Sequence, residues 1–142
     1  MQMRAGVITI ILTAILVWLL SGLFYMVLAK DMMAAAMAPY ASVMNPMDSV
    51  PIYVWLLVTL FPATLLMVIL TQVSGPIAVR RGVMMGITMS LLTCVPWEIT
   101  HRLMYQHHDT TFSVVNCGWD ALQWAIGGAV MAMVYSKLYR SA

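Results

Sequence analysis

The segment from Ala5 to Ala29 reads AGVITIILTAILVWLLSGLFYMVLA, lies between Arg4 and Lys30, and contains no charged residue. About 20 consecutive apolar residues are enough for an α-helix to cross the hydrocarbon core of a bilayer. The run is also too long for the apolar region of a cleaved signal peptide, which spans about 7–15 residues. This segment therefore predicts a retained transmembrane helix at 5–29.

Three further apolar segments follow, each between charged residues, and they predict helices at 51–73, 81–104 and 117–138. Pro51 suits the first turn of its helix, where a missing N–H is tolerated. The four helices and their short loops occupy the whole chain. We therefore expect one domain over 1–142, an all-α integral membrane four-helix bundle.

The composition of the chain also indicates that it lies in a lipid bilayer. Of its 142 residues, 63% are hydrophobic and 8% are charged, whereas about 25% of a typical soluble domain is charged. A soluble fold of this size could not bury so much apolar surface. The net charge of +2 gives no reason to expect nucleic-acid binding. The expected partners are the lipid bilayer and other membrane protein subunits or further copies of this chain.

Basic residues are distributed unevenly between the predicted loops and ends. The segments predicted on the same side of the membrane as the N-terminus carry five basic residues and no acid: Arg4, Arg80, Arg81, Lys137 and Arg140. The opposite segments carry Lys30 and Arg102 together with all five acids. Cytoplasmic loops are enriched in Lys and Arg. Both termini are therefore predicted to be cytoplasmic, in a multi-pass protein of a bacterial cytoplasmic (inner) membrane.

Small residues recur on two of the predicted helices. The third carries them at every fourth position, and the fourth carries a second strip: Gly82, Gly86, Ser90 and Cys94, then Ala121, Ala125, Gly128 and Ala132. Lipid gives helices no hydrophobic drive to associate, so close backbone approach through small residues supports their packing. We predict that the two strips face each other or a partner helix.

Polar residues gather where the last two predicted helices approach the outer face. On the last predicted helix, Asn116, Asp120 and Gln123 share one face. On the helix before it, Cys94, Glu98 and His101 share one face if that helix continues past Pro96. Carboxylates cannot extend to the interface as Lys and Arg do. We expect Glu98 and Asp120 to lie near each other, with His101, Arg102 and Asn116 around them, and one acid to hold a proton. A structural ion pair with Arg102 is the alternative.

Histidines and methionines on the outer side raise the question of a metal. The candidate ligands are His101, His107, His108, Met33, Met37, Met44 and Met47, and thioethers select Cu(I). Methionine is also an adaptable apolar filler, which fits a loop helix around Met32 to Ala38. No cofactor is predicted, and copper is kept as an alternative. Cys94 and Cys117 either pair in an oxidising compartment or serve as small packing residues.

Two short motifs carry a resemblance. Gly22-Leu23-Phe24-Tyr25 closes the first predicted span, and Asn116-Cys117-Gly118-Trp119-Asp120 opens the last, with Gly127-Gly128 following. Their order resembles a family of small four-helix bacterial membrane proteins of unknown function. That family often has Gly followed by Trp-Tyr at the first place, where this chain has Leu23-Phe24, and Asn-x-Gly before the last helix. The resemblance implies the four-helix architecture and no activity.

Three classes of function remain open. The first is a packing or accessory subunit of a larger membrane assembly, favoured because no complete catalytic set is present, so an enzyme is not expected. The second is an outer-face membrane protein that binds a ligand or metal, or an enzyme, using Glu98, His101 and Asp120. The third is a transporter, which would require an oligomer because four helices enclose little volume.

Overall fold

Helices make up nearly all of the structure. The computed structural model describes residues 2–41, 49–72, 77–104 and 109–140. Its helices are α1 (Gln2–Leu23), the π-helical turn η1 (Phe24–Leu28), α2 (Lys30–Met37), the 3₁₀ turn η2 (Ala38–Tyr40), α3 (Ile52–Gln72), α4 (Val79–Met104) and α5 (Thr110–Arg140). The described residues contain no strand, so the all-α prediction is confirmed.

Three of these helices are long and apolar enough to cross a membrane: Met3–Leu28, Ile52–Gln72 and Val79–Met104. They coincide with the first three predicted spans, as expected of a small membrane protein. α5 begins at Thr110 rather than at about 117, and its 31 residues make it the longest helix of the described chain. α5 is not among the three helices apolar enough to cross a membrane, because its first half carries Asn116, Asp120 and Gln123 among its apolar residues.

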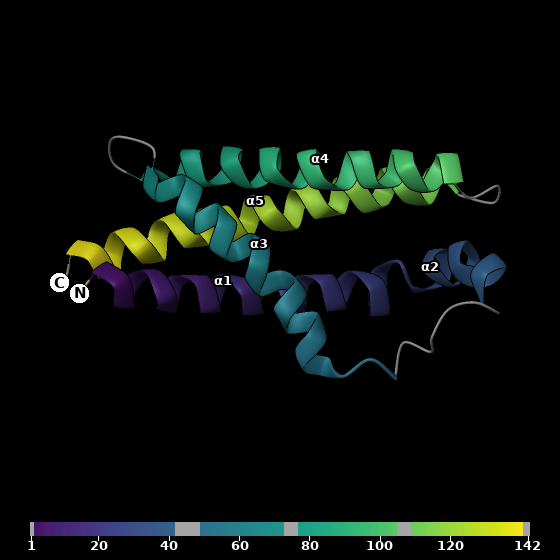
Figure 1. The fold of residues 1–142 in the computed structure, drawn as a ribbon, viewed down its shortest axis with the longest axis horizontal. Coiled ribbons are helices and arrows are strands. Elements are labelled where there is room, and N and C mark those ends of the chain that lie inside the picture. The colour runs from purple at the N-terminus through teal and green to yellow at the C-terminus, as the bar shows by residue number, and fades with distance from the viewer. Residues whose placement is uncertain (1, 42–48, 73–76, 105–108, 141–142) are drawn as a thin grey trace.

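The long helices pack in a simple order (Figure 1). α5 lies between α1 and α4 and contacts both, whereas α3 crosses α1 at a wide angle and touches α4 only at one end. The two chain termini lie at the same end of the molecule. α4 continues through Pro96 to Met104, which places Glu98 and His101 on the same helix as the small-residue strip.

The buried core joins all four long helices. Its residues are Ala14 and Val17 of α1, Ala63, Leu66, Met67 and Leu70 of α3, Met89 of α4, and Trp124 and Met131 of α5. Near the other end of α1, the ring of Phe24 stacks on Trp119 with centroids 4.8 Å apart. Large apolar side chains cover the outer surfaces, including Phe61, which is 78% exposed. Such a surface suits contact with lipid.

The closest approach between helices is between α4 and α5. A Cβ atom built on Gly82 would collide with the backbone of Gly128 and come 2.9 Å from the Cβ of Ala132, and a Cβ on Gly128 would collide with the backbone of Gly82. A Cβ on Gly86 would meet the carbonyl group of Trp124 and come 3.3 Å from the amide nitrogen of Ala125. The two strips of small residues therefore meet each other inside this chain.

Gly128→Ala tests this contact. The added methyl group would force the two backbones apart, and overpacking of this kind costs about 1–3 kcal/mol of unfolding free energy. Gly118→Ala, on the same helix, is the matched control because nothing lies within 4 Å of its Cβ position. It should leave stability unchanged or slightly raised, since Ala favours helix over Gly by about 1 kcal/mol. Thermal unfolding in detergent, followed by circular dichroism, should show a lower midpoint for Gly128→Ala alone; equal midpoints would contradict the close approach.

Candidate functional site

Beyond the glycine contacts, the α4–α5 interface becomes polar. We call the following residues the polar cluster: Ser21 and Tyr25 from α1 and η1, Ser90, Cys94 and Glu98 from α4, and Asn116, Cys117, Asp120 and Gln123 from α5. The α4 members continue the four-residue spacing of Gly82 and Gly86. The same stripe of α4 thus provides close packing at one end and hydrogen-bonding groups at the other.

Asp120 is held by two neutral donors. The Ser90 hydroxyl donates to Oδ2 of Asp120 at 2.6 Å, and Nε2 of Gln123 donates to Oδ1 at 2.7 Å. Ser90 is completely buried and Gln123 is 4% exposed. Each carboxylate oxygen thus has a partner, and neither of these two donors carries a charge that would balance an ionised Asp120.

The same order of groups occurs twice in the cluster. Ser21 donates its hydroxyl to Oε1 of Gln123 at 2.9 Å, and the amide nitrogen of Gln123 then donates to Asp120. Tyr25 donates its hydroxyl to Oδ1 of Asn116, and the amide nitrogen of Asn116 donates to Oε1 of Glu98 at 2.9 Å. Each carboxylate is therefore connected through an amide on α5 to a hydroxyl group on the α1 side.

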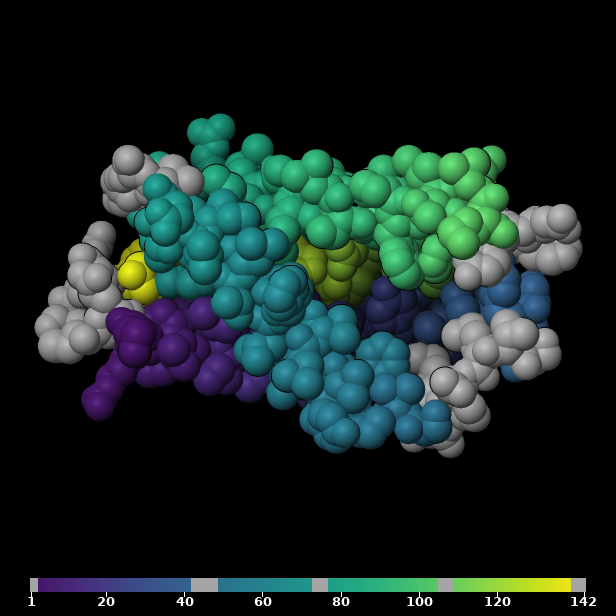
Figure 2. Space-filling view, in the orientation of Figure 1, coloured from purple at the N-terminus to yellow at the C-terminus, as the bar shows by residue number. Residues whose placement is uncertain are grey.

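The cluster is only partly closed. Glu98 is 9% exposed, whereas Tyr25, Asn116 and Asp120 are half-buried. Figure 2 shows α5 and α1 lying recessed in the space between α3 and α4, where α3 diverges from the other helices. The wide crossing of α3 thus leaves one side of the α1–α5–α4 group uncovered.

The two cysteines lie within the cluster. Both are free and half-buried. Nδ2 of Asn116 lies 4.0 Å from Sγ of Cys94. Asn116 therefore contacts both Cys94 and Glu98, which are one helical turn apart on α4.

The structure brings together most of the polar residues singled out in the sequence. Glu98, Asn116, Asp120 and Gln123 belong to one hydrogen-bonded group, with Asn116 bound to Glu98 and Gln123 bound to Asp120. Arg102, expected between the acids, is exposed and takes no part in these hydrogen bonds, because it lies a full turn beyond Glu98 toward the end of α4. His101 is half-buried and packs on Trp97, with ring centroids 4.3 Å apart.

The candidate metal ligands are only partly covered by the structure. Met33 and Met37 are half-buried on α2, which is the short loop helix considered for the methionine-rich segment. His107, His108, Met44 and Met47 lie outside the described residues. Within the described ranges, no group of three or more His, Cys, Asp or Glu residues is arranged to hold a metal ion. The copper hypothesis remains a prediction.

Two members of the cluster escaped the sequence analysis. Ser21 of α1 and Tyr25 of η1 stand four residues apart in a mainly apolar segment, and this spacing was the available signal. A hydroxyl group in a membrane helix often bonds its own backbone, as Thr9 does with the carbonyl of Ala5. Sequence spacing alone therefore could not distinguish hydroxyls that reach another helix from those that do not.

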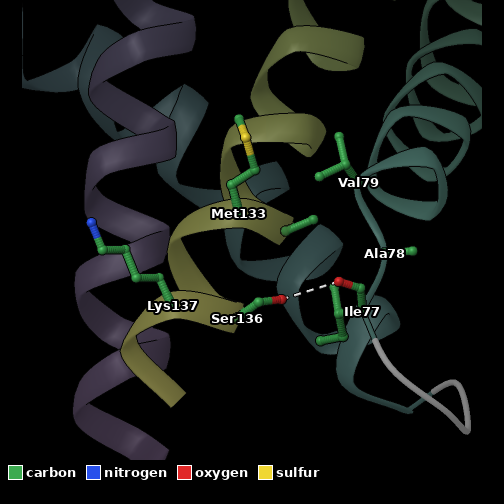
Figure 3. A pocket seen from close by; sticks show the side chains of 7 residues that line it. Ile77, Ala78, Val79, Met133, Ser136 and Lys137 are labelled. Carbon is green, nitrogen blue, oxygen red and sulfur yellow. Dashed lines mark hydrogen bonds between the residues drawn. The ribbon is translucent and has the colours of Figure 1, made fainter. Parts of the chain in front are cut away.

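A separate pocket lies toward the opposite end of the α4–α5 pair (Figure 3). It has a volume of about 540 Å³ and is lined by Ile77, Ala78, Val79, Ala132, Met133, Ser136 and Lys137. Ser136 closes one side by donating its hydroxyl to the carbonyl of Ile77 at 3.1 Å. The walls are otherwise mainly apolar, so this pocket offers no group of side chains suited to chemistry.

Comparisons of this chain with known protein families, with curated proteins and with solved structures find no match.

Proposed function

We propose that this chain is a four-span membrane protein whose polar cluster binds and releases a proton at its two carboxyl groups, Asp120 and Glu98. The observation that carries the proposal is the pairing of both Asp120 oxygens with neutral donors, Ser90 and Gln123. Ionisable groups within membrane spans are costly and commonly mark functional sites. Neutral donors stabilise a carboxylate but leave its charge uncompensated, so uptake of a proton lowers the cost of burial.

The hydrogen bonds of the cluster suit both states of Asp120. When the acid is ionised, the Ser90 hydroxyl donates to it, as at the 2.6 Å contact. When the acid is protonated, the hydroxyl can rotate and accept the proton of the carboxyl group, because Ser is both donor and acceptor. The other titratable groups of the polar cluster are Glu98, Tyr25, Cys94 and Cys117. A second carboxyl group in the cluster disfavours joint ionisation.

The four-span arrangement is part of the proposal. α5 is long enough to cross a bilayer at about 1.5 Å per residue, and its Asn116, Asp120 and Gln123 bond to side chains of α4 or α1 rather than face lipid. The chain ends lie together (Figure 1), as four crossings require. With the termini cytoplasmic, Arg80 and Arg81 lie on the cytoplasmic side and the α4–α5 connection lies outside, so the cluster exchanges protons with the outer phase.

An accessory subunit of a larger membrane assembly is the second candidate. The small-residue strips no longer support it, since they pack against each other within the chain. α3 supports it instead, because it packs mainly on α1 and leaves α4 largely uncovered on that side (Figure 2). A partner helix seated beside α3 would complete the packing of the bundle.

Topology can be tested with single cysteines in a Cys94→Ser, Cys117→Ser background. We expect a membrane-impermeant maleimide applied to intact cells to label a cysteine at Asp109 and to spare one at Arg80, both of which are exposed positions. Permeabilised cells should label both and so confirm that each is reactive. Labelling of position 80 alone in intact cells would reverse the orientation.

Proton binding can be tested with Asp120→Asn. Asn keeps the shape and can donate to the Ser90 hydroxyl, so the fold should hold, with a change of at most about 1 kcal/mol in unfolding free energy. Infrared difference spectra of protein in lipid, recorded as pH is raised, should show loss of a protonated-carboxyl band that is missing in Asp120→Asn. Asp31→Asn, at an exposed position, is the control and should retain the band. A large fall in stability with no missing band would identify Asp120 as a charged structural clamp.

The accessory-subunit candidate makes a different prediction. Native mass spectrometry after gentle extraction from the protein's own membrane should then find this chain bound to a second protein at fixed stoichiometry. The α3 variant Phe61→Ala, at an exposed position, should weaken that complex, whereas Leu92→Ala on α4 serves as an equally apolar control. Recovery of the chain alone or only with itself would remove this candidate.

A further inference from the structure

The two cysteines of the chain lie on the two helices that form the α4–α5 interface. Cys94 lies on the stripe of α4 that begins with Gly82 and Gly86. Because α4 and α5 are antiparallel, each residue four positions further along this stripe contacts a residue about four positions earlier on α5. Gly82 meets Gly128, Gly86 meets Trp124, and Ser90 meets Asp120. The next step brings Cys94 to Asn116, whose Nδ2 lies 4.0 Å from Sγ of Cys94, and Cys117 follows Asn116 on α5.

We propose that Cys94 and Cys117 are a reversible redox pair, and that their disulfide joins α4 covalently to α5 inside the polar cluster. A disulfide requires the two Cα atoms to lie within about 4.4–6.8 Å. Helices separated by larger interface residues rarely approach so closely. Here the glycine contacts earlier on the same stripe already bring the two backbones together, and Cys94 already contacts Asn116, which directly precedes Cys117. This proposal does not depend on proton binding by Asp120.

The chemistry is thiol–disulfide exchange with an external disulfide as the oxidant. One cysteine, as the thiolate, attacks a sulfur of the external disulfide, whose S–S bond breaks and releases one thiol. The second cysteine then attacks the first cysteine's sulfur in the mixed disulfide and releases the second thiol. The protein loses two protons and two electrons, one S–S bond forms, and the external disulfide is reduced to two thiols. A reducing thiol reverses both steps.

The placement of the pair suits such a reaction. Cys94 lies about 15 Å before the end of α4 at Met104, and Cys117 about 10 Å after the start of α5 at Thr110, at about 1.5 Å per residue. Both side chains are half-buried rather than enclosed. In the proposed topology this end of the helices faces outward, where disulfides persist. A small apolar disulfide can therefore reach them from the outer part of the bilayer.

Oxidation would also affect the neighbouring acid. Asn116 contacts Sγ of Cys94 at 4.0 Å and Oε1 of Glu98 at 2.9 Å, and it precedes Cys117 in sequence. Drawing the two sulfur atoms together to about 2.05 Å must shift Cys94, Cys117 or both against Asn116. The redox state of the pair is thereby coupled to the hydrogen bond that holds Glu98.

The test uses the unmodified chain, reduced and then treated with a membrane-permeant dipyridyl disulfide in lipid nanodiscs. We expect an intact mass lower by two hydrogen atoms, release of two thiopyridone molecules per reagent consumed, and loss of both alkylatable thiols. Dithiothreitol should restore the mass and the thiols. The thermal midpoint should rise by several degrees on oxidation and return on reduction, while the Cys94→Ser, Cys117→Ser variant should not respond.

The single variants supply the matched controls. Cys94→Ser and Cys117→Ser each retain one thiol, so each should stop at the mixed disulfide and gain the mass of one thiopyridyl group. If the unmodified chain instead carries two such groups, forms dimers between chains, or fails to react, the two cysteines are not a redox pair and the proposal is overturned.

Discussion

The contact on which the rest of this structure depends is the mutual approach of the Gly82 and Gly128 backbones. No side chain separates α4 from α5 there, and any Cβ at either position would collide with the opposite backbone. In a bilayer, where apolar side chains gain nothing from leaving lipid, such an approach provides van der Waals contact and weak Cα–H···O bonds. The glycines also fix the register of the two helices. A shift of one residue would replace a glycine with Val83 or Ala129.

That register determines the chemistry of the other end. With Gly86 against Trp124, the next residue of the stripe, Ser90, faces Asp120, and Cys94 faces Asn116, which precedes Cys117. The hydrogen bonds of Asp120 and Glu98 are then made by residues that the glycine contacts have positioned. α1 is fixed to the same pair by a second glycine, since a Cβ on Gly127 would come 2.8 Å from the side chain of Val17. Ser21 and Tyr25, one and two turns further along, thereby reach Gln123 and Asn116.

The sequence predicted some of this and missed the rest for physical reasons. Uninterrupted apolar runs located the helices, because length and hydropathy alone decide whether a segment can cross a bilayer. The spacing of Gly82, Gly86, Ser90 and Cys94 marked a packing stripe, and Glu98 was expected on the same face only if the helix continued past Pro96, as it does. Arg102 was expected beside the acids because opposite charges attract, whereas the structure satisfies Asp120 with neutral groups. Partners on α1 could not be inferred, because contacts between distant segments depend on how the helices pack.

The division of the stripe into a glycine half and a polar half has a mechanical consequence. The glycine half has only one arrangement, because backbones in direct contact leave no room for an alternative. The polar half has several, since hydroxyl groups can reverse their hydrogen bonds, carboxyl groups can gain a proton and two adjacent thiols can join. A pure structural clamp would be expected to use amides throughout, which form the same bonds without the cost of a buried charge. Two carboxyl groups in place of amides are therefore the feature of this interface that packing alone does not explain. The rigid glycine contact is what would confine the structural effect of a change in their protonation to the polar half of the stripe.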